Sequence, residues 1–158
     1  MASAGLDAAV VAQTSQRLKS ALGKWAYVAA ALAQKSRAKT PDIMVTAGAE
    51  TLRCRLAICA NSARYGGNFV IAPQTSATQP GLALVALTDD SLFALLRIGF
   101  RLLSGRGLAG AGVRILETSE ATLSSTQETA AQVDGDPFGV TPVRATAAQT
   151  PVRLIVSA

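Results

Sequence analysis

A segment near the end of the chain carries two carboxylates that can take part in proton transfer. Asp134 and Asp136 flank Gly135 within the stretch from Gln132 to Gly139, which lies between two runs with strand character. Asp-Gly at a strand junction predicts first of all a hairpin turn, because glycine accepts a positive φ without steric cost. A carboxylate at a loop tip can also accept a proton from a substrate hydroxyl during phosphoryl transfer. The residues alone leave both interpretations open, and one loop can satisfy both.

Two residue types narrow the chemistry further. The sequence contains no histidine, which excludes the usual neutral-pH general base, the Ser-His-Asp and Cys-His arrangements and most zinc sites. The two cysteines, Cys54 and Cys59, fall in one predicted strand at odd spacing, so we expect their side chains on opposite faces and no disulfide between them. Unpaired thiols indicate a reducing compartment, and we expect a cytoplasmic protein.

Two further segments contain polar or glycine residues that could line a site. Asp7 lies in the segment 4–8, and Asn61, Gly66 and Gly67 lie in the segment 61–69 between two predicted strands. Taken singly, each is typical of a local turn, and Gly66-Gly67 is typical of a hairpin.

Residues 105–110 match the spacing Gly-x-Gly-x-x-Gly, by which glycines let a backbone approach a pyrophosphate. Here the motif follows a predicted helix and precedes a predicted strand, which is the reverse of the order that dinucleotide binding requires. We interpret it as a flexible turn.

Hydrophobic spacing predicts the elements that hold these residues. Residues 13–35 repeat apolar positions at helical spacing, and short strand-like runs follow at 43–46, 52–60, 69–72, 82–87, 113–117, 121–125, 129–133, 140–146 and 152–156. A second helix is expected after Asp89-Asp90-Ser91, with Gly105 beyond its end and Leu92, Leu95, Leu96, Ile98 and Leu102 inside. We predict one domain, 1–158, with a mainly β (α+β) fold: an antiparallel β-sandwich-like domain with one long N-terminal helix and a second, shorter helix.

Charge and composition limit the classes of molecule that this chain can bind. The net charge is +5, the chain is 49% apolar and only 16% charged, and the excess of Lys and Arg lies in residues 1–66. The basic face of the first helix favours a solvated surface over contact with an anionic membrane. No apolar run approaches the ~20 residues of a bilayer span. With 4% aromatic residues and no recognition motif, a nucleic-acid partner is disfavoured.

Several short motifs occur in an order that resembles a known family. They are residues 5–11 and 18–27, Asn61 through Gly67, Ile71-Ala72-Pro73, Gly81-Leu82 and residues 133–137. The series is similar to the second domain of bacterial diacylglycerol-kinase-like lipid kinases, relatives of sphingosine and ceramide kinases that share a fold with NAD kinases. The resemblance covers nearly the whole chain.

The resemblance implies a two-domain, ATP-dependent lipid kinase whose nucleotide-binding N-terminal domain is absent from this chain, since the family's Gly-Gly-Asp-Gly motif does not occur. ATP and Mg²⁺ would be held mainly by that domain, so this domain alone would be inactive. Asp134 matches the family's proton acceptor and Asp7 a position facing the lipid head group. The loop with Asn61, Gly66 and Gly67 would line the cleft between the domains. Peripheral contact with an anionic inner membrane surface is compatible with this role.

The sequence also departs from the family pattern. Where relatives carry a carboxylate-rich segment that holds a structural magnesium, this chain has residues 79–84, and Pro80 and Leu84 offer no side-chain oxygen. We expect that metal site to be absent. Asn68 replaces a further family glycine. These departures keep a second function open, a non-catalytic lipid or membrane-surface binding module.

Overall fold

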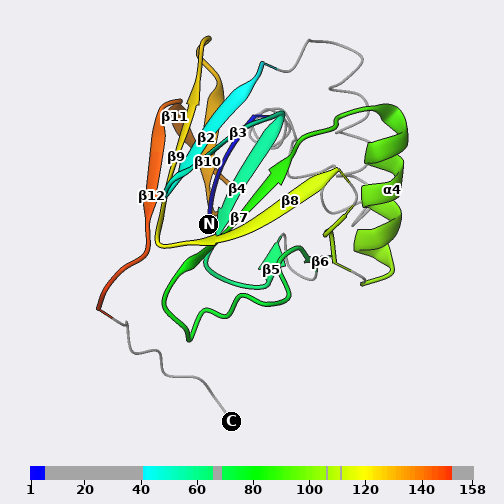
Figure 1. The fold of residues 1–158 in the computed structure, drawn as a ribbon, viewed down its shortest axis with the longest axis horizontal. Coiled ribbons are helices and arrows are strands. Elements are labelled where there is room, and N and C mark those ends of the chain that lie inside the picture. Colours follow the sequence, from blue (N-terminus) through cyan, green and yellow to red (C-terminus); the bar gives the residue numbers. More distant parts are fainter. Residues whose placement is uncertain (6–40, 66–68, 106, 111, 151–158) are drawn as a thin grey trace.

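Two stacked antiparallel sheets form the body of the domain (Figure 1). The computed structural model describes residues 1–5, 41–65, 69–105, 107–110 and 112–150, so the predicted helix at 13–35 and the predicted strand at 152–156 lie outside the described residues. The larger sheet has the order β11-β10-β1-β4-β7-β8. Its strands are β1 (Ala2–Gly5), β4 (Leu56–Ala60), β7 (Leu82–Leu87), β8 (Val113–Thr118), β10 (Ala130–Val133) and β11 (Asp136–Val140).

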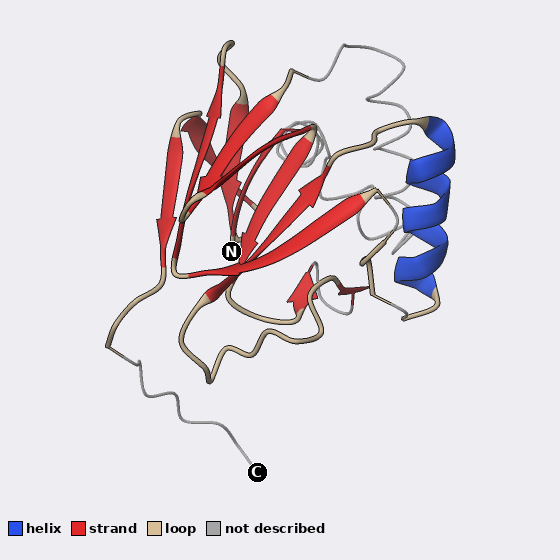
Figure 2. Cartoon of the chain, in the orientation of Figure 1, coloured by secondary structure: helices blue, strands red, loops and turns tan. Residues whose placement is uncertain are grey.

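The smaller sheet has the order β12-β9-β2-β3, and a separate hairpin pairs two short strands. Its strands are β2 (Ile43–Ala47), β3 (Glu50–Cys54), β9 (Glu120–Ser125) and β12 (Val143–Thr146), and the hairpin is β5 (Arg64–Tyr65) with β6 (Phe69–Val70). One helix, α4 (Leu92–Leu103), is present in the described part of the chain (Figure 2). The mainly β, sandwich-like prediction is confirmed.

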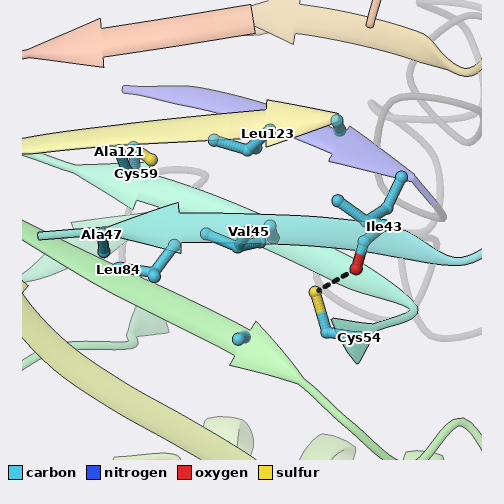
Figure 3. Close-up of a cluster of buried hydrophobic side chains, with 11 residues drawn as sticks. Ile43, Val45, Ala47, Cys54, Cys59, Leu84, Ala121 and Leu123 are labelled. Carbon is cyan, nitrogen blue, oxygen red and sulfur yellow. Dashed lines mark hydrogen bonds between the residues drawn. The ribbon is translucent and has the colours of Figure 1, made fainter. Parts of the chain in front are cut away.

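The first core lies between the two sheets. On β2, Ile43, Val45 and Ala47 are buried while the residues between them are exposed, as expected for a strand with one covered face. They pack against residues of the larger sheet, among them Cys59 and Leu84 (Figure 3). Apart from Leu84 and Leu123, the buried residues of this cluster are small or β-branched, and none is aromatic.

The second core covers the opposite face of the larger sheet. Alternate residues of β4 and β7, such as Ile58 and Val85, point to this side and contact Leu95 of α4 together with Leu108 from the loop after it. Because both faces of the central strands are covered, β7 is apolar throughout instead of alternating. The molecule therefore has three layers, which are the small sheet, the large sheet and α4 with its neighbouring loops.

Helix α4 begins where the sequence predicts, but the residues facing the core differ in part. Ser91 is its N-cap and accepts a hydrogen bond from the Ala94 N–H. Leu95, Ile98 and Leu102 pack on the second core as predicted, whereas the prediction that Leu92 and Leu96 lie inside is wrong, because both side chains are exposed. A helix this apolar carries hydrophobic residues on two faces, and spacing alone does not show which face the sheet covers.

Two of the predicted strands prove to be pairs of strands in different sheets. The run 52–60 breaks at Arg55, where the chain passes from β3 in the small sheet to β4 in the large sheet. The run 140–146 breaks at the cis peptide between Thr141 and Pro142, where the chain passes from β11 to β12. The packing of the two sheets reveals the break at Arg55, whereas Pro142 already marks the second break in the sequence, because proline cannot donate to a strand ladder. The run 82–87 is confirmed as a single strand.

The break at Arg55 also corrects the prediction for the cysteines. Cys54 on β3 and Cys59 on β4 do not lie on opposite faces of one strand, because they belong to different sheets and both point into the core between the sheets (Figure 3). Both remain free thiols, as predicted. The Cys54 thiol lies 3.6 Å from the carbonyl oxygen of Ile43, to which it donates.

Strand β1 has no counterpart among the predicted strands, although it lies between β10 and β4. Its residues, Ala-Ser-Ala-Gly, have little intrinsic preference for strands. They suit this position because they are small. A Cβ atom built on Gly5, whose φ is +100°, would lie 2.5 Å from the carbonyl oxygen of Arg55, so the chain crossing at Arg55 requires glycine here.

We expect Gly5→Ala to lower the free energy of unfolding by at least about 2 kcal/mol, because it adds both a clash with backbone and an unfavourable φ. Gly48→Ala is the matched control: Gly48 has a φ of +58° and no atom within 4 Å of the place that a Cβ would take, so the cost should be about 1 kcal/mol. Urea unfolding followed by circular dichroism measures both. Equal losses of unfolding free energy in the two variants would show that the close contact between Gly5 and the Arg55 carbonyl oxygen adds no cost to the alanine replacement.

The buried thiols predict a pH dependence of stability. Burial raises the pKa of Cys54 and of Cys59 from the ordinary value of 9.0 to about 12. The unfolded chain ionises each thiol near pH 9.0, whereas the folded chain keeps it protonated until about pH 12. The stabilisation is therefore complete below the first value and is lost as the pH rises towards the second, on the order of 1 kcal/mol per pH unit for each thiol.

Denaturant unfolding at increasing alkaline pH measures this loss, and the Cys54→Ala/Cys59→Ala variant should show a shallower slope. The folded protein should also resist alkylation by iodoacetamide until denaturant is added. Rapid labelling of either thiol in the folded protein would contradict the burial.

Candidate functional site

The Asp134-Gly135 turn closes the hairpin between β10 and β11. Val133 and Asp136 are paired across the hairpin, so the two residues between them form the loop. Asp134 has a φ of +51° and Gly135 of +96°, and both values are positive as in the type I′ turn that two-residue hairpins favour. Asp134 is also the only non-glycine residue with a positive φ in the described part of the chain. The predicted hairpin is therefore confirmed, and it places Asp134 at the tip of the loop.

A buried glutamine supports the turn. The side-chain oxygen Oε1 of Gln132 accepts a 2.7 Å hydrogen bond from the Gly135 N–H, and the side-chain nitrogen Nε2 donates a 2.7 Å hydrogen bond to the Ser3 hydroxyl. Gln132 and Ser3 are almost completely buried and are paired across β10 and β1. Because an unsatisfied polar group at such a site is costly, this network fixes the turn to β1 of the larger sheet.

The carboxylate of Asp134 is open to solvent yet tethered. Its side chain is 73% exposed, and one oxygen lies 2.5 Å from the amino group of Met1. The backbone N–H of Asp134 also donates to the Met1 carbonyl oxygen at 3.0 Å. An ion pair this exposed adds little stability, whereas the backbone bond to the Met1 carbonyl oxygen fixes the backbone of Asp134 beside the start of β1. A substrate group could still reach the carboxylate.

The strand register brings a second predicted residue to the same end of the larger sheet. Ala2 of β1 lies opposite both Val133 of β10 and Cys59 of β4. Asn61 follows β4 directly and is exposed. Since β1 separates β10 from β4, the backbones of Asn61 and Asp134 lie about two strand spacings apart, or about 10 Å. The register thus places Asn61 and Asp134 at the same end of the larger sheet.

The other predicted site residues, Asp7, Gly66 and Gly67, lie outside the described residues. The segments on either side of the glycine pair are described. Tyr65 of β5 lies opposite Phe69 of β6, so the chain makes a hairpin there, as the sequence predicts. This hairpin begins three residues after Asn61.

The glycine motif at 105–110 connects α4 to β8, so its order of elements is helix, turn and strand, as predicted. Gly105, Gly107 and Gly110 all have positive φ, which is typical of a turn. The Gly107 carbonyl oxygen accepts a 2.9 Å hydrogen bond from Arg101 of α4. The motif therefore ends the helix and does not form a phosphate loop.

Other charged groups in the described residues form structural pairs. Arg53 and Arg55 both contact Asp42, and the hydrogen bond from Arg53 lowers the pKa of the Asp42 carboxyl. Arg55 also lies 3.9 Å from Asp90, just before α4. Among the described residues, no three Cys, Asp or Glu side chains are grouped so as to hold a metal ion. Within the same residues, no helix is long and apolar enough to cross a bilayer.

Sequence patterns do not mark Gln132 and Ser3 as contributors to the site. Gln132 occurs just before the Asp-Gly pair, but glutamine near a turn has no distinctive meaning. Ser3 is 129 positions away along the chain. Only the pairing of β1 with β10 brings the two side chains together, so no local signal could have found them.

Comparison with known proteins agrees with the fold. Residues 1–156 match the family described as the YegS C-terminal NAD kinase beta sandwich-like domain. No curated protein matches the chain in sequence.

Several solved structures share the fold. A protein from Bacillus anthracis str. Sterne described as a putative diacylglycerol kinase superposes with a TM-score of 0.69 at 14% identity, over 94% of this chain and 49% of that chain. Another, described as a diacylglycerol kinase from the same organism, superposes with a TM-score of 0.65 at 13% identity, over 94% of this chain and 49% of that one. The chain thus spans about half the length of these structures. By its sequence match and its fold, the chain belongs to the family of YegS C-terminal NAD kinase beta sandwich-like domains and resembles the C-terminal part of diacylglycerol-kinase-like proteins.

Proposed function

We propose that this domain is the lipid-binding and proton-accepting part of an ATP-dependent lipid kinase that phosphorylates the hydroxyl of diacylglycerol or a related lipid alcohol. Family membership and the fold shared with diacylglycerol-kinase-like proteins support the reaction class. The observation that carries the proposal is the exposed carboxylate of Asp134 at the tip of a hairpin. The buried side chain of Gln132 stabilises this hairpin by a hydrogen bond to the Gly135 N–H.

In the proposed reaction Asp134 accepts the proton of the lipid's primary hydroxyl. As that proton moves to the carboxylate, the hydroxyl oxygen forms its bond to the phosphorus, and the bond from phosphorus to the leaving oxygen breaks. The arrangement suits this role because the carboxylate is exposed while the backbone of the turn is fixed. The Asp134 N–H donates to the Met1 carbonyl oxygen, and the Gly135 N–H donates to the Gln132 side chain. Asn61, Gly66, Gly67 and Asp7 are proposed to line the lipid side of the cleft.

ATP and Mg²⁺ supply the phosphoryl group and neutralise its charge when they are bound. The described residues contain no group of acidic side chains arranged to hold a metal ion. The proposal therefore assigns nucleotide and metal to a separate nucleotide-binding domain, and this domain by itself is expected to be inactive. Two free thiols are typical of a reducing compartment, so we place the protein in the cytoplasm, with its lipid substrate at the inner membrane surface.

One observation favours the second function, a non-catalytic lipid or membrane-surface binding module. Leu84 is fully buried in the core between the sheets, within the segment where the resembled kinases carry oxygen ligands for a structural magnesium. If the domain is such a binding module, Asp134 serves only as a turn residue. The two functions differ in whether replacing the Asp134 carboxylate abolishes turnover.

We expect Asp134→Asn, made in the complete protein that carries this domain, to reduce kcat for diacylglycerol phosphorylation by at least about a hundredfold. Asparagine tolerates the positive φ at this position, so the turn should persist while the proton acceptor is lost. The assay follows labelled γ-phosphate transferred from Mg-ATP. Asp136→Asn is the matched control, because it removes a neighbouring exposed carboxylate of the same hairpin and should leave kcat nearly unchanged.

Activity that survives Asp134→Asn would return Asp134 to the role of a turn residue. A complete protein that phosphorylates no lipid alcohol would favour the binding module. Loss of activity in both variants would show that the hairpin needs its overall charge and not a specific proton acceptor.

Gln132 is a positioning residue in this proposal, and its effect can be separated from simple stability. We expect Gln132→Leu to lower the free energy of unfolding by about 1–3 kcal/mol and also to lower kcat, because the Gly135 N–H loses its partner. Ser3→Ala removes the other end of the network but leaves the bond to Gly135. It should cost stability while kcat stays near the wild-type value at a temperature where all variants are folded.

A kcat for Gln132→Leu that equals that of Ser3→Ala would mean that the glutamine contributes only stability. Calorimetry and steady-state kinetics on the same samples give both quantities.

A further inference from the structure

Helix α4 exposes an apolar face that nothing in the described part of the chain covers. Phe93 is 75% exposed and Phe100 is 66% exposed, and Leu92 and Leu96 are also more than half exposed. Their spacing places them along one side of the helix. Large exposed side chains gathered in this way are unusual on a monomer surface and indicate a contact site.

The other side of the same helix is firmly attached to the domain. Ala94 and Leu95 are buried, and Ile98 and Leu102 pack on the second core. Ser91 caps the first turn, and the bond from Arg101 to the Gly107 carbonyl holds the last turn. Figure 2 shows α4 as the outermost element beside the larger sheet. The exposed face is therefore presented on a rigid support and does not need to fold on contact.

The charges on this helix have one sign. Arg97 and Arg101 are the only charged residues within α4, and no acidic residue lies in its first turn. The Arg97 guanidinium lies over the ring of Phe93, 6.0 Å from its centroid. The acidic residues just before the helix are engaged, because Asp89 accepts from the Ser91 N–H and Asp90 lies near Arg55. The face thus combines phenylalanine and leucine with arginine.

We propose that this face of α4 docks on an anionic lipid bilayer. Helices that lie in the membrane interface typically combine phenylalanine and leucine with arginine. In such helices the apolar side chains enter the boundary of the acyl chains, and the guanidinium groups contact lipid phosphates. The helix of 12 residues is about 18 Å long, too short to cross a bilayer but suited to lying along its surface. A protein partner would instead have to supply a carboxylate for Arg97 inside an apolar contact.

This docking adds a membrane-binding surface to the proposed function. It rests on that function, because a lipid kinase must reach a substrate that resides in the bilayer. Docking through α4 would hold the larger sheet next to the membrane. The basic face of the first predicted helix is not needed for this contact.

The test uses the complete protein that carries the domain and measures its binding to phosphatidylcholine vesicles with and without phosphatidylglycerol. We expect tighter binding to the vesicles that contain phosphatidylglycerol. Phe93→Ser/Phe100→Ser should weaken that binding by about tenfold or more. Arg97→Gln should weaken it by about fivefold and only on the anionic vesicles.

Met44→Ser is the matched control. Met44 is also an exposed apolar residue, but it lies on β2 of the smaller sheet, which is the layer farthest from α4. Its replacement should leave vesicle binding unchanged. Circular dichroism and sedimentation of each variant establish that it is folded and whether it self-associates.

Three results would overturn the proposal. Vesicle binding that is unaffected by the phenylalanine replacements would exclude α4 as the docking face. Dimers that dissociate when Phe93 and Phe100 are replaced would show that a second copy covers the face. An α4 protected from solvent in the complete protein, by hydrogen exchange without vesicles, would show that another part of the protein covers it.

Activity on a short-chain diacylglycerol that is monomeric in solution separates this proposal from the kinase proposal. That substrate needs no bilayer, so the α4 variants should keep their activity on it. A protein that phosphorylates it but fails the vesicle test loses only the docking inference. A protein that binds vesicles through α4 but phosphorylates no lipid alcohol loses only the kinase.

Discussion

The structure depends on a large sheet that is buried on both faces. Its central strands β4 and β7 meet the small sheet on one side and α4 with its neighbouring loops on the other. Hydrophobic burial on both sides requires strands without polar alternation, and β7 meets that requirement along almost its whole length. Both candidate features of the domain are placed relative to this sheet. The Asp134 turn lies at one end of it, and the exposed face of α4 lies on its outer side.

Strand β1 shows how small residues make this arrangement possible. It lies between β10 and β4 and pairs with both, although its sequence has little preference for strands. Gly5 lets the chain cross between the sheets at Arg55, and Ser3 gives Gln132 a buried partner. A single short strand thus joins the sheet and supports the site. Just before this strand, the Met1 carbonyl oxygen accepts a hydrogen bond from the Asp134 N–H.

The candidate site has an exposed carboxylate on a two-residue loop that a sheet supports, and many folds place functional groups on such loops. Both central residues of this hairpin have positive φ, as in a type I′ turn, and a buried amide holds the turn as well. The open side of Asp134 leaves room for a substrate. Helix α4 brings a different property, since its outer face carries exposed apolar groups and arginine, from which we propose docking on a lipid surface.

The local sequence pattern was sufficient to predict the features that depend only on residues adjacent in the chain. The Asp-Gly hairpin, the start of α4 at Ser91 and the strand at 82–87 follow from turn chemistry, capping and apolar runs, and all three are found in the structure. The ordered motifs also indicated the family, which the match over residues 1–156 bears out. The candidate Asp134 came from the same local signal.

Only the tertiary structure decided which residues meet across long separations. The break at Arg55 lies inside the predicted run 52–60, where the change of sheet is determined by packing, whereas the break at Thr141-Pro142 coincides with a proline, which interrupts a strand ladder. Packing likewise determines that Cys54 and Cys59 share one core, and that Leu92 and Leu96 face outward on a helix that is apolar on two sides. The Gln132–Ser3 contact depends on strand pairing between the two ends of the chain. Strand pairing and layer order are non-local, and a single sequence carries no period that reveals them.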